Sequence, residues 1–542
     1  MIKFELKNSI KKTIEKLYPD FSGVDFNVDE PPQNVDGDLA SNVSLVLAKK
    51  LGAPPQKIAE AIKGSGIPLE CVKKVEASKN GFLNFYLEEG YLKKRTLEIA
   101  LEGKKALRPK GAGSGPILIE FVSANPTGPL HVGHGRGAAL GDSLARIYRQ
   151  CGAVVQKEYY INDMGVQMEV LAKSVEIRAQ QMDGTLTPFP ENGYQGAYIQ
   201  KIAEEMRAQK REDFTSYPKA HILRWIETDL KDFGVTFDSW FEESALHKEK
   251  KVEEALEILQ AKQRLKTKEG ALWFVNLEKE EEGDGELDKD RVLRKSDGRY
   301  TYFASDVAYH RNKFERGFKQ CIDIWGHDHH GYAPRLEAAT AALDLPTNFL
   351  KILLYQLVSL KRGGKRISMS TRSGTFVTLK EVLDEVGRDA CRFFFAMRSP
   401  NSQLEFDLDL AKKRTNENPV FYVQYVHARI ASIFREAVER NIAISWDGGS
   451  EKISLETEER ELMKKLIFFP DLLNASVEAS SPHLIATYLI ECGALFHRFY
   501  DKCRVLDAPD AARQFRFTLL AATRNVVNLG LDLLGVSAPE RM

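Results

Sequence analysis

Two histidines three residues apart, His131 and His134, stand between an apolar segment and an amphipathic one. Residues 117–122 are largely apolar and predict a buried strand, and the apolar stripe after the histidines predicts a helix. Backbone N–H groups at a helix start carry a positive partial charge, so a helix that follows a parallel strand is suited to binding phosphate. Gly133 and Gly135 would let such a ligand approach the backbone, and the imidazoles would donate to it. The spacing alone fits a pair of capping or packing histidines equally well.

A second polar cluster, GHDHH, follows another apolar run at residues 321–325. Histidine and aspartate are ligands of zinc and iron, so Asp328 and His329 suggest a metal site. Successive side chains of an extended segment point to opposite sides, which weakens that interpretation. We therefore expect no dedicated metal site here.

Length and composition indicate a globular chain of two to four domains. It has 542 residues, 43% hydrophobic and 28% charged, and its 77 basic residues balance 77 acidic ones, so a polyanionic partner would have to be bound by local patches. The sequence holds no apolar run of the roughly 20 residues that cross a bilayer. Six cysteines without a C-x-x-C pair argue against disulfides and thiolate zinc sites, and we expect a cytoplasmic protein.

Changes in pattern along the chain predict three domains. Residues 1–110 end at the linker LRPKGAGSGP and predict a small N-terminal α+β domain. Residues 111–384 alternate apolar runs, among them LKILLYQLVSL, with helical patterns, as in a doubly wound parallel sheet of the α/β class. Amphipathic, charged residues at about 166–275 predict an insertion in this sheet domain. Residues 385–542 keep apolar positions at helical spacing and predict a helical bundle.

The segment around the histidines also resembles a known family. HVGH resembles the HIGH signature of class I aminoacyl-tRNA synthetases, and its setting SANPTGPLHVGHGRGAALGD resembles that of arginyl-tRNA synthetases. The resemblance covers nearly the whole chain: GDLASNVSLVLAKKLG and NGFLNFYL are similar to the family's N-terminal module, YYINDMG, GYQGAYI and WGHDHHGY to its catalytic core, and GRDACRFFF, FDLDLA, NPVFYVQYVHARI and LLGVSAPERM to its anticodon-binding domain. It implies a Rossmann-type catalytic domain between two tRNA-binding domains.

The resemblance implies a ligase that activates L-arginine with ATP to arginyl-adenylate. The arginyl group then passes to the 3′ end of an arginine-accepting tRNA, and pyrophosphate and AMP are released. Magnesium would arrive with ATP. We expect the protein to act as a monomer.

The resemblance also implies roles for individual residues. His131 and His134 would contact ATP phosphates, and the nucleotide would be bound by Gly133, Gly135, Gly326, Asp328 and His329. Substrate arginine, whose five N–H donors need carboxylates and planar acceptors, would be bound by Glu120, Asn125, Tyr302 and Asp306. Tyr302 and Asp306 are four apart and would share a helix face, although such a pair is more often a surface pair or an N-terminal cap.

The family's second signature, KMSKS, is altered in this chain. The matching residues are Ser368, Met369, Ser370, Thr371 and Arg372, so both lysines of the signature are missing. Many relatives without the second lysine carry one just before the HIGH segment, but the matching residue here is Gly128. We expect Met369 and Ser370 to contact the nucleotide. Arg372 is the candidate cation for pyrophosphate, because a guanidinium binds phosphate through two parallel hydrogen bonds, and Lys365 is the alternative. Without the resemblance, this segment would be interpreted as a solvated basic loop.

Basic and aromatic residues alternate between residues 387 and 430, a combination expected for binding single-stranded RNA. DACR at 389–392 matches the family's DALR signature. We expect the following phenylalanines to be core and the RNA contacts to come from Tyr422, Gln424, His427 and Arg429.

Two other functions fit part of the pattern. A different nucleotidyl transferase of the HIGH type would lack the SAPERM ending and the paired terminal RNA modules. A synthetase-like tRNA-binding protein with an eroded signature loop would account for Thr371, but not for the presence of His131, Glu120 and Asp306.

Overall fold

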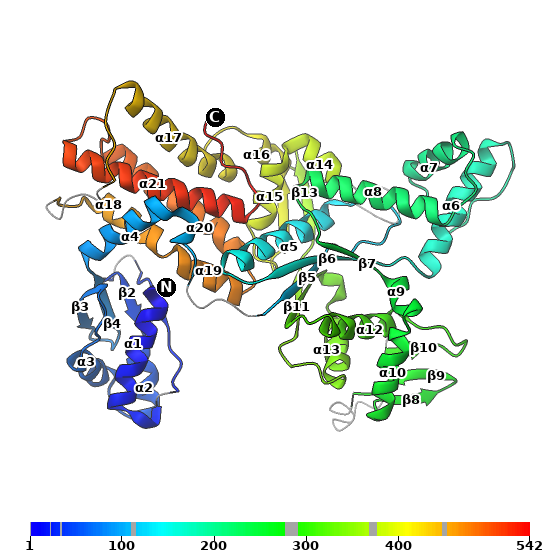
Figure 1. Ribbon diagram of the computed structural model, residues 1–542, viewed down its shortest axis with the longest axis horizontal. Coiled ribbons are helices and arrows are strands. Elements are labelled where there is room, and N and C mark those ends of the chain that lie inside the picture. Colours follow the sequence, from blue (N-terminus) through cyan, green and yellow to red (C-terminus); the bar gives the residue numbers. More distant parts are fainter. Residues whose placement is uncertain are drawn as a thin grey trace.

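The computed structural model describes residues 2–21, 23–32, 35–109, 115–276, 291–367, 377–446 and 453–542 (Figure 1). In Figure 1 the N-terminal elements, drawn in blue, lie below the C-terminal helices, drawn in yellow to red. The central sheet lies beside them, and the middle of the chain forms two further groups of elements on its other side. Within the described ranges, no helix has the length and apolar character needed to cross a membrane.

Five parallel strands form the central sheet in the order β12-β11-β5-β6-β7. They are β5 (Ile117–Phe121), β6 (Val155–Ile161), β7 (Ser239–Glu242), β11 (Gln320–Gly326) and β12 (Leu350–Tyr355). The first of these strands in the sequence, β5, lies in the middle of the sheet, and later strands are added on both sides of it. This order confirms the predicted doubly wound architecture. In such a sheet a ligand crevice forms where the strand order reverses, at the carboxyl ends of β5 and β11.

Different helices cover the two faces of this sheet. Ile119 and Phe121 lie in a core that includes α5 (Val132–Gln150). Leu118 lies in a second core with α10 (Lys251–Ala261), α12 (Tyr302–Glu315) and α13 (Ala333–Ala342). Because side chains alternate along a strand, Glu120 lies on the same face as Leu118, beneath α12.

The segment 166–275, which we expected to be an insertion, also contributes a strand to the central sheet. It holds α6 (Val166–Met182), α7 (Ala197–Ala208), α8 (Ser216–Asp232), α9 (Glu243–Lys248) and α10, and β7 lies between α8 and α9. β7 pairs in parallel with β6. A separate antiparallel sheet follows, made of β8 (Leu265–Lys268), β9 (Ala271–Phe274) and β10 (Val292–Arg294).

The N-terminal elements form an antiparallel sheet of order β1-β2-β4-β3 with helices packed around it. The strands are β1 (Val28–Asp29), β2 (Leu39–Ser41), β3 (Val72–Ala77) and β4 (Leu83–Leu87), and the helices are α1 (Ile2–Leu17), α2 (Val43–Leu51), α3 (Pro55–Ser65) and α4 (Glu89–Glu102). Buried Asp38 ties this sheet to the C-terminal helices, because its two carboxylate oxygens accept from Arg460 at 2.7 Å.

After β12 the chain is mainly helical, apart from a small sheet of order β14-β13-β15. Its strands are β13 (Val358–Arg362), β14 (Lys365–Ile367) and β15 (Leu404–Asp407), and the helices are α14 (Leu379–Val386), α15 (Arg388–Ala396), α16 (Leu408–Lys412), α17 (Pro419–Glu439), α18 (Thr457–Ile467), α19 (Phe469–Glu478), α20 (His483–Lys502) and α21 (Asp510–Leu533). The apolar run LKILLYQLVSL thus forms two strands in two sheets. Buried Arg136 of α5 donates to Gln356 O at this break, at 2.6 Å, and so fixes α5 to the point where the chain leaves the central sheet.

Candidate active site

A cavity of about 570 Å³ opens at the carboxyl ends of β5 and β11, where the strand order predicts a ligand crevice. Its wall brings together many of the residues singled out in the sequence, namely Glu120, Asn125, His131, His134, Tyr302, Asp306, Gly326, Asp328 and His329. The last two belong to a short 3-10 turn, η4 (His327–His329), rather than to an extended segment. Residues from distant parts of the chain therefore share one pocket.

Backbone hydrogen bonds fix the two histidines at the start of α5. His131 is the N-cap residue, and its Nδ1 accepts from the N–H groups of Gly133 and His134 at 3.1 and 3.3 Å. The Nδ1 of His134 accepts from the His131 N–H at 3.2 Å, and the two rings stack with centroids 3.6 Å apart. Since each Nδ1 is an acceptor, each ring proton lies on Nε2, the atom that can donate to a phosphate. Burial lowers the pKa of both imidazoles, that of His134 to about 3, so both are neutral at neutral pH.

Gly133 and Gly135 have packing roles in this structure, and their contacts with the nucleotide stay a prediction. A Cβ on Gly133 would lie 2.9 Å from Cε1 of the His131 ring, so a side chain would displace the histidine. A Cβ on Gly135 would lie 2.7 Å from Leu379 and 3.1 Å from Phe395. Glycine at this position therefore lets α5 approach α14 and α15 closely.

Glu120 belongs to a buried charge cluster behind the cavity wall. Its Oε1 accepts from the Ser123 hydroxyl at 2.9 Å, and its Oε2 accepts from Lys313 Nζ at 2.6 Å. The same ammonium donates to Asp323 Oδ1 at 3.0 Å, and Asp323 Oδ2 is hydrogen-bonded to His310 Nε2 at 2.6 Å. Glu120 is 5% exposed, and Lys313 and Asp323 are fully buried. Burial raises the pKa of Glu120, and the Lys313 ammonium opposes that rise.

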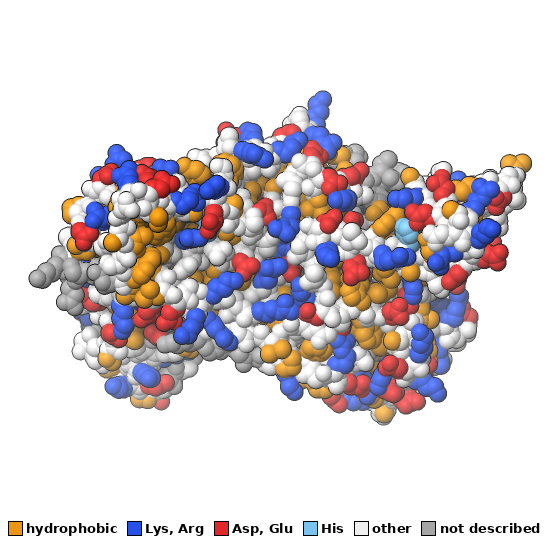
Figure 2. All heavy atoms as spheres, turned by 45° about the horizontal axis from the view of Figure 1, so that its top comes forward, with side chains coloured by type: hydrophobic (Ala, Val, Ile, Leu, Met, Phe, Trp, Pro, Cys, Tyr) orange, Lys and Arg blue, Asp and Glu red, His pale blue; other side chains and the backbone are white. Residues whose placement is uncertain are grey.

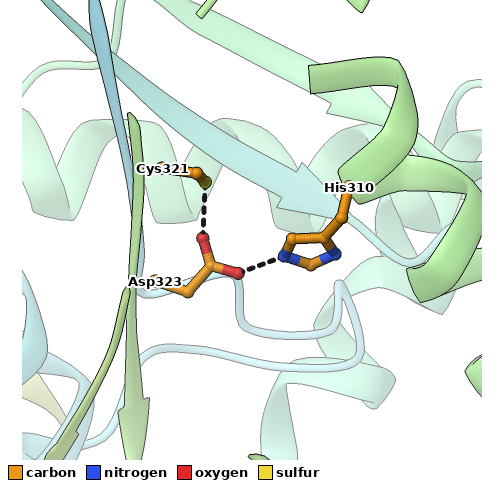
Figure 3. A group of neighbouring side chains, drawn as sticks. All are labelled: His310, Cys321 and Asp323. Atoms are coloured by element: carbon orange, nitrogen blue, oxygen red, sulfur yellow. Dashed lines mark hydrogen bonds and ion pairs between the residues drawn. The ribbon is translucent and has the colours of Figure 1, made fainter. Parts of the chain in front are cut away.

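His310, Cys321 and Asp323 form the one group, in the ranges that the structure describes, whose ligand atoms lie close enough to share a metal ion (Figure 3). Within it, Cys321 Sγ donates to Asp323 Oδ1 and His310 bonds the other carboxylate oxygen. The Lys313 ammonium lies 3.0 Å from Asp323 Oδ1 and 3.4 Å from His310 Nε2. It supplies the positive charge that a metal would bring, so these residues do not fit a metal site.

Tyr302 and Asp306 lie on one helix, α12, and both line the cavity. Asp306 Oδ2 accepts from the Tyr332 hydroxyl, and burial raises the pKa of Asp306 to about 7. Tyr302 is 48% exposed, so its ring offers a surface on which a ligand can pack. Asn125, in the loop after β5, donates to Gln167 at 2.7 Å.

Sequence reasoning missed Glu243, a third carboxylate of the wall. It is the first residue of α9, directly after β7, and it is 4% exposed. A residue that follows a parallel strand lies at the same edge of the sheet as the end of β5. Recognition of the strand SWFE would therefore have pointed to Glu243.

The altered signature loop lies outside the described residues, which leave out 368–376 and with them Met369, Ser370 and Arg372. Lys365, the alternative cation, is an exposed residue of β14. Beyond these residues, Val377 O accepts from the Val132 N–H at 3.2 Å.

The chain immediately after the loop is also anchored beside the histidines. The Leu379 N–H donates to Leu130 O at 2.8 Å, and His131 and Thr378 form an isolated β-bridge. The segment 377–379 is therefore attached next to His131.

Gly128 is covered by Tyr198 of α7. A Cβ on Gly128 would lie 3.0 Å from Tyr198 Oη, and this hydroxyl donates to Thr127 O at 2.7 Å. A lysine at this position would have to displace the tyrosine.

The four residues expected to contact RNA fall into two pairs. Gln424 and His427 of α17 are buried beneath the C-terminal segment. Gln424 Nε2 donates to Ser537 O at 2.9 Å, and His427 Nδ1 is hydrogen-bonded to Pro539 O at 2.9 Å. These two side chains hold the C-terminal segment against α17, and their contact with RNA stays a prediction.

Tyr422 and Arg429 are partly exposed and lie among aromatic side chains. Tyr422 packs against His497 with ring centroids 4.9 Å apart, and the Arg429 guanidinium lies 4.8 Å from the centre of the Tyr500 ring. On the face of the molecule drawn in Figure 2, Lys and Arg side chains are interspersed with Asp and Glu. On that face a nucleic acid would meet local groups of cations rather than one basic surface.

Three family models match the chain in succession. Residues 5–87 match the arginyl tRNA synthetase N terminal domain. Residues 96–403 match the catalytic domain of class I (R) tRNA synthetases, and residues 423–542 match the DALR anticodon binding domain.

Curated relatives and a solved structure agree with these matches. An arginine–tRNA ligase of Geobacter sp. (strain M21) is 44% identical, with 100% of both chains covered. Another from Aquifex aeolicus (strain VF5) is 40% identical, with 99% of both chains covered. The solved structure of Thermus thermophilus arginyl-tRNA synthetase superposes with a TM-score of 0.79 over 100% of both chains, at 24% identity, which supports the fold.

Proposed function

Because this chain belongs to the arginyl-tRNA synthetase family, we propose that the cavity at β5 and β11 is where arginine attacks the α-phosphate of ATP. The chain is a class I ligase that activates L-arginine and transfers the arginyl group to tRNA. One observation carries the proposal: Glu120 and Asp306 line the same cavity as His131 and His134. Carboxylates for a guanidinium and imidazoles for phosphates have to share a pocket if arginine is to meet ATP.

In this proposal the guanidinium of arginine is bound by the acidic wall of the cavity. Its five N–H donors lie in one plane and need acceptors on more than one side. Glu120 comes from β5, Asp306 from α12 and Glu243 from α9, so the three carboxylates approach from separate elements. Tyr302 would pack on the ligand, and Asn125 would complete its polar contacts.

His131 and His134 would bind the ATP phosphates through their Nε2–H groups. Because both imidazoles are neutral, they donate hydrogen bonds but bring no positive charge. Charge that builds on the departing pyrophosphate would be balanced by Mg²⁺ that arrives with ATP and by Arg372, with Lys365 as the alternative. Gly326, Asp328 and His329 lie on the wall beside the histidines and would contact the nucleoside.

The tRNA would span the three parts of the chain. We propose that residues 385–542 bind the anticodon, that residues 111–384 bind its 3′ end, and that residues 1–110 contact the outer corner of the L-shaped RNA. Tyr422 and Arg429 support this assignment, because partly exposed aromatic and guanidinium groups can stack on splayed bases.

Arginine-dependent exchange of pyrophosphate into ATP, with cognate tRNA present, tests the proposed site. Asp306→Asn should raise KM for arginine far more than KM for ATP, and equal increases would refute the role of Asp306. The alternative function is a catalytically eroded, synthetase-like tRNA-binding protein. A folded sample that binds tRNA but exchanges pyrophosphate with no amino acid would establish that alternative.

Cellular location and assembly are further parts of the proposal. All six cysteines lie in described parts of the chain, and they are buried free thiols, as expected in a reducing compartment. We propose that the protein works in the cytoplasm and as a monomer. Sedimentation velocity at micromolar concentration would test the second point.

A further inference from the structure

Lys313 is a fully buried cation that lies behind the wall of the cavity. We infer that Lys313 is a positioning residue for arginine recognition: it holds the Glu120 carboxylate ionised and oriented toward the cavity without contacting the substrate. This inference rests on the proposed binding of arginine by Glu120.

The position of Lys313 on α12 places it opposite the sheet. Asp306, His310 and Lys313 are spaced by four and three residues, so they lie along one face of the helix. Asp306 lines the cavity. One turn further along α12, His310 is hydrogen-bonded to Asp323 of β11, and Lys313 donates to Glu120 of β5. The helix that carries one arginine-binding carboxylate thus also holds the counter-ion of the other.

Lys313 is the cation that contacts Glu120 among the described residues. Its ammonium lies within 3.0 Å of one oxygen of Glu120 and one of Asp323, and Asp323 has His310 as a further partner. Because burial makes an unpaired charge costly, Glu120 depends on Lys313 to stay ionised at the cavity wall.

Without Lys313, the negative charge would move away from the cavity. Glu120 and Asp323 are paired residues of neighbouring strands, and two buried carboxylates at such a site cannot both stay ionised. Asp323 keeps two other hydrogen-bond partners, His310 and Cys321, whereas among the described residues Glu120 keeps only the Ser123 hydroxyl. The proton would therefore settle on Glu120, and the wall that faces arginine would become neutral.

A double-mutant cycle with Lys313→Met and Glu120→Gln tests this inference, with KM for arginine and for ATP measured by pyrophosphate exchange. Lys313→Met alone should raise KM for arginine at least about tenfold, because it leaves a buried charge pair broken. KM for ATP should change less than about twofold, since no member of the cluster faces the phosphates. In the Glu120→Gln background, the same change should add less than about threefold, because Lys313 acts through Glu120.

Lys157→Met is the matched control. Lys157 and Asp142 form another buried pair on β6 and α5, 2.9 Å apart, away from the cavity wall. Lys157→Met should lower the melting temperature, as Lys313→Met should. Unlike Lys313→Met, it should leave KM for arginine within about twofold of its original value. If Lys313→Met does not fold, Lys313→Gln replaces it: the amide can still donate to a carboxylate but carries no charge, and KM for arginine should again rise selectively.

The outcomes separate the inference from the function on which it rests. If Glu120→Gln raises KM for arginine but Lys313→Met does not, or if the two effects multiply, the positioning role is wrong. If Lys313→Met raises both KM values equally, Lys313 is only structural. If Glu120→Gln itself leaves KM for arginine unchanged, the proposed role of Glu120 is wrong instead.

Discussion

The pKa of Asp306 predicts that arginine binding depends on pH near neutrality. Burial is the largest influence and raises this pKa to about 7; the Tyr332 hydroxyl and His310 oppose the rise, and Glu120 and Glu243 add to it. A guanidinium binds the ionised carboxylate, so affinity is complete above this pKa and is lost as the pH falls through it. With a pKa of about 7, the ionised fraction falls from about nine tenths at pH 8 to about one tenth at pH 6, which makes KM for arginine about tenfold higher at pH 6.

Pyrophosphate exchange at saturating ATP, measured between pH 6 and pH 8, would check this dependence. KM for arginine should rise as the pH falls, while KM for ATP stays within about twofold, because burial lowers the pKa of both His131 and His134. Asp306→Asn should give a higher KM for arginine that no longer changes over these two pH units. Asp328→Asn, on the nucleotide side, should keep the pH dependence. A KM for arginine that is flat in the unmodified protein, or equally steep in Asp306→Asn, would refute the reasoning.

Three further predictions concern stability and the phosphate site. Arg392→Met should lower the free energy of unfolding, measured by urea denaturation, by about 3–5 kcal/mol. Arg392 is fully buried and donates to Asp142 at 2.7 Å and to Leu534 O at 2.6 Å, and a loss below about 1 kcal/mol would contradict the importance of these bonds. His134→Asn should slow activation, measured by pyrophosphate exchange, but leave the pH dependence of the rate between pH 6 and pH 8 unchanged, because burial lowers the pKa of His134 to about 3. A pH dependence that changes in this variant would contradict the reasoning. Arg372→Ala should slow activation, measured by pyrophosphate exchange, and leave tRNA binding largely intact; an unchanged rate would transfer the role to Lys365.

The sequence was sufficient to predict the elements that carry the site, because their signals are local. Continuous apolar runs correspond to β5, β6 and β11, which are buried on both faces. The four-residue spacing of Tyr302 and Asp306 corresponds to the helix α12, with both residues at the cavity. Each of these predictions depends on a few consecutive residues.

Contacts between distant segments could not be predicted in the same way. Glu243 follows a four-residue strand, SWFE, whose pattern is too short to show a period. In the sequence, Lys313 cannot be distinguished from an ordinary lysine on the surface of a helix. The packing of α12 on β5 and β11 is what buries it between two carboxylates. The roles of such residues depend on the tertiary structure.

The DACR motif illustrates how that tertiary structure connects the two ends of the enzyme. Asp389 accepts from the Gln424 amide at 2.9 Å and from the Ser537 N–H at 3.2 Å, and Arg392 donates to Leu534 O. Arg392 also pairs with Asp142 of α5, the helix that begins with the histidine pair. Two residues three apart on α15 therefore fasten the C-terminal segment to α17 on one side and to α5 on the other. Gln424 also bonds Asp389, so its burial and the position of α5 depend on the same helix, α15. A polar residue of α17 can therefore help to position the helix that begins with the histidine pair.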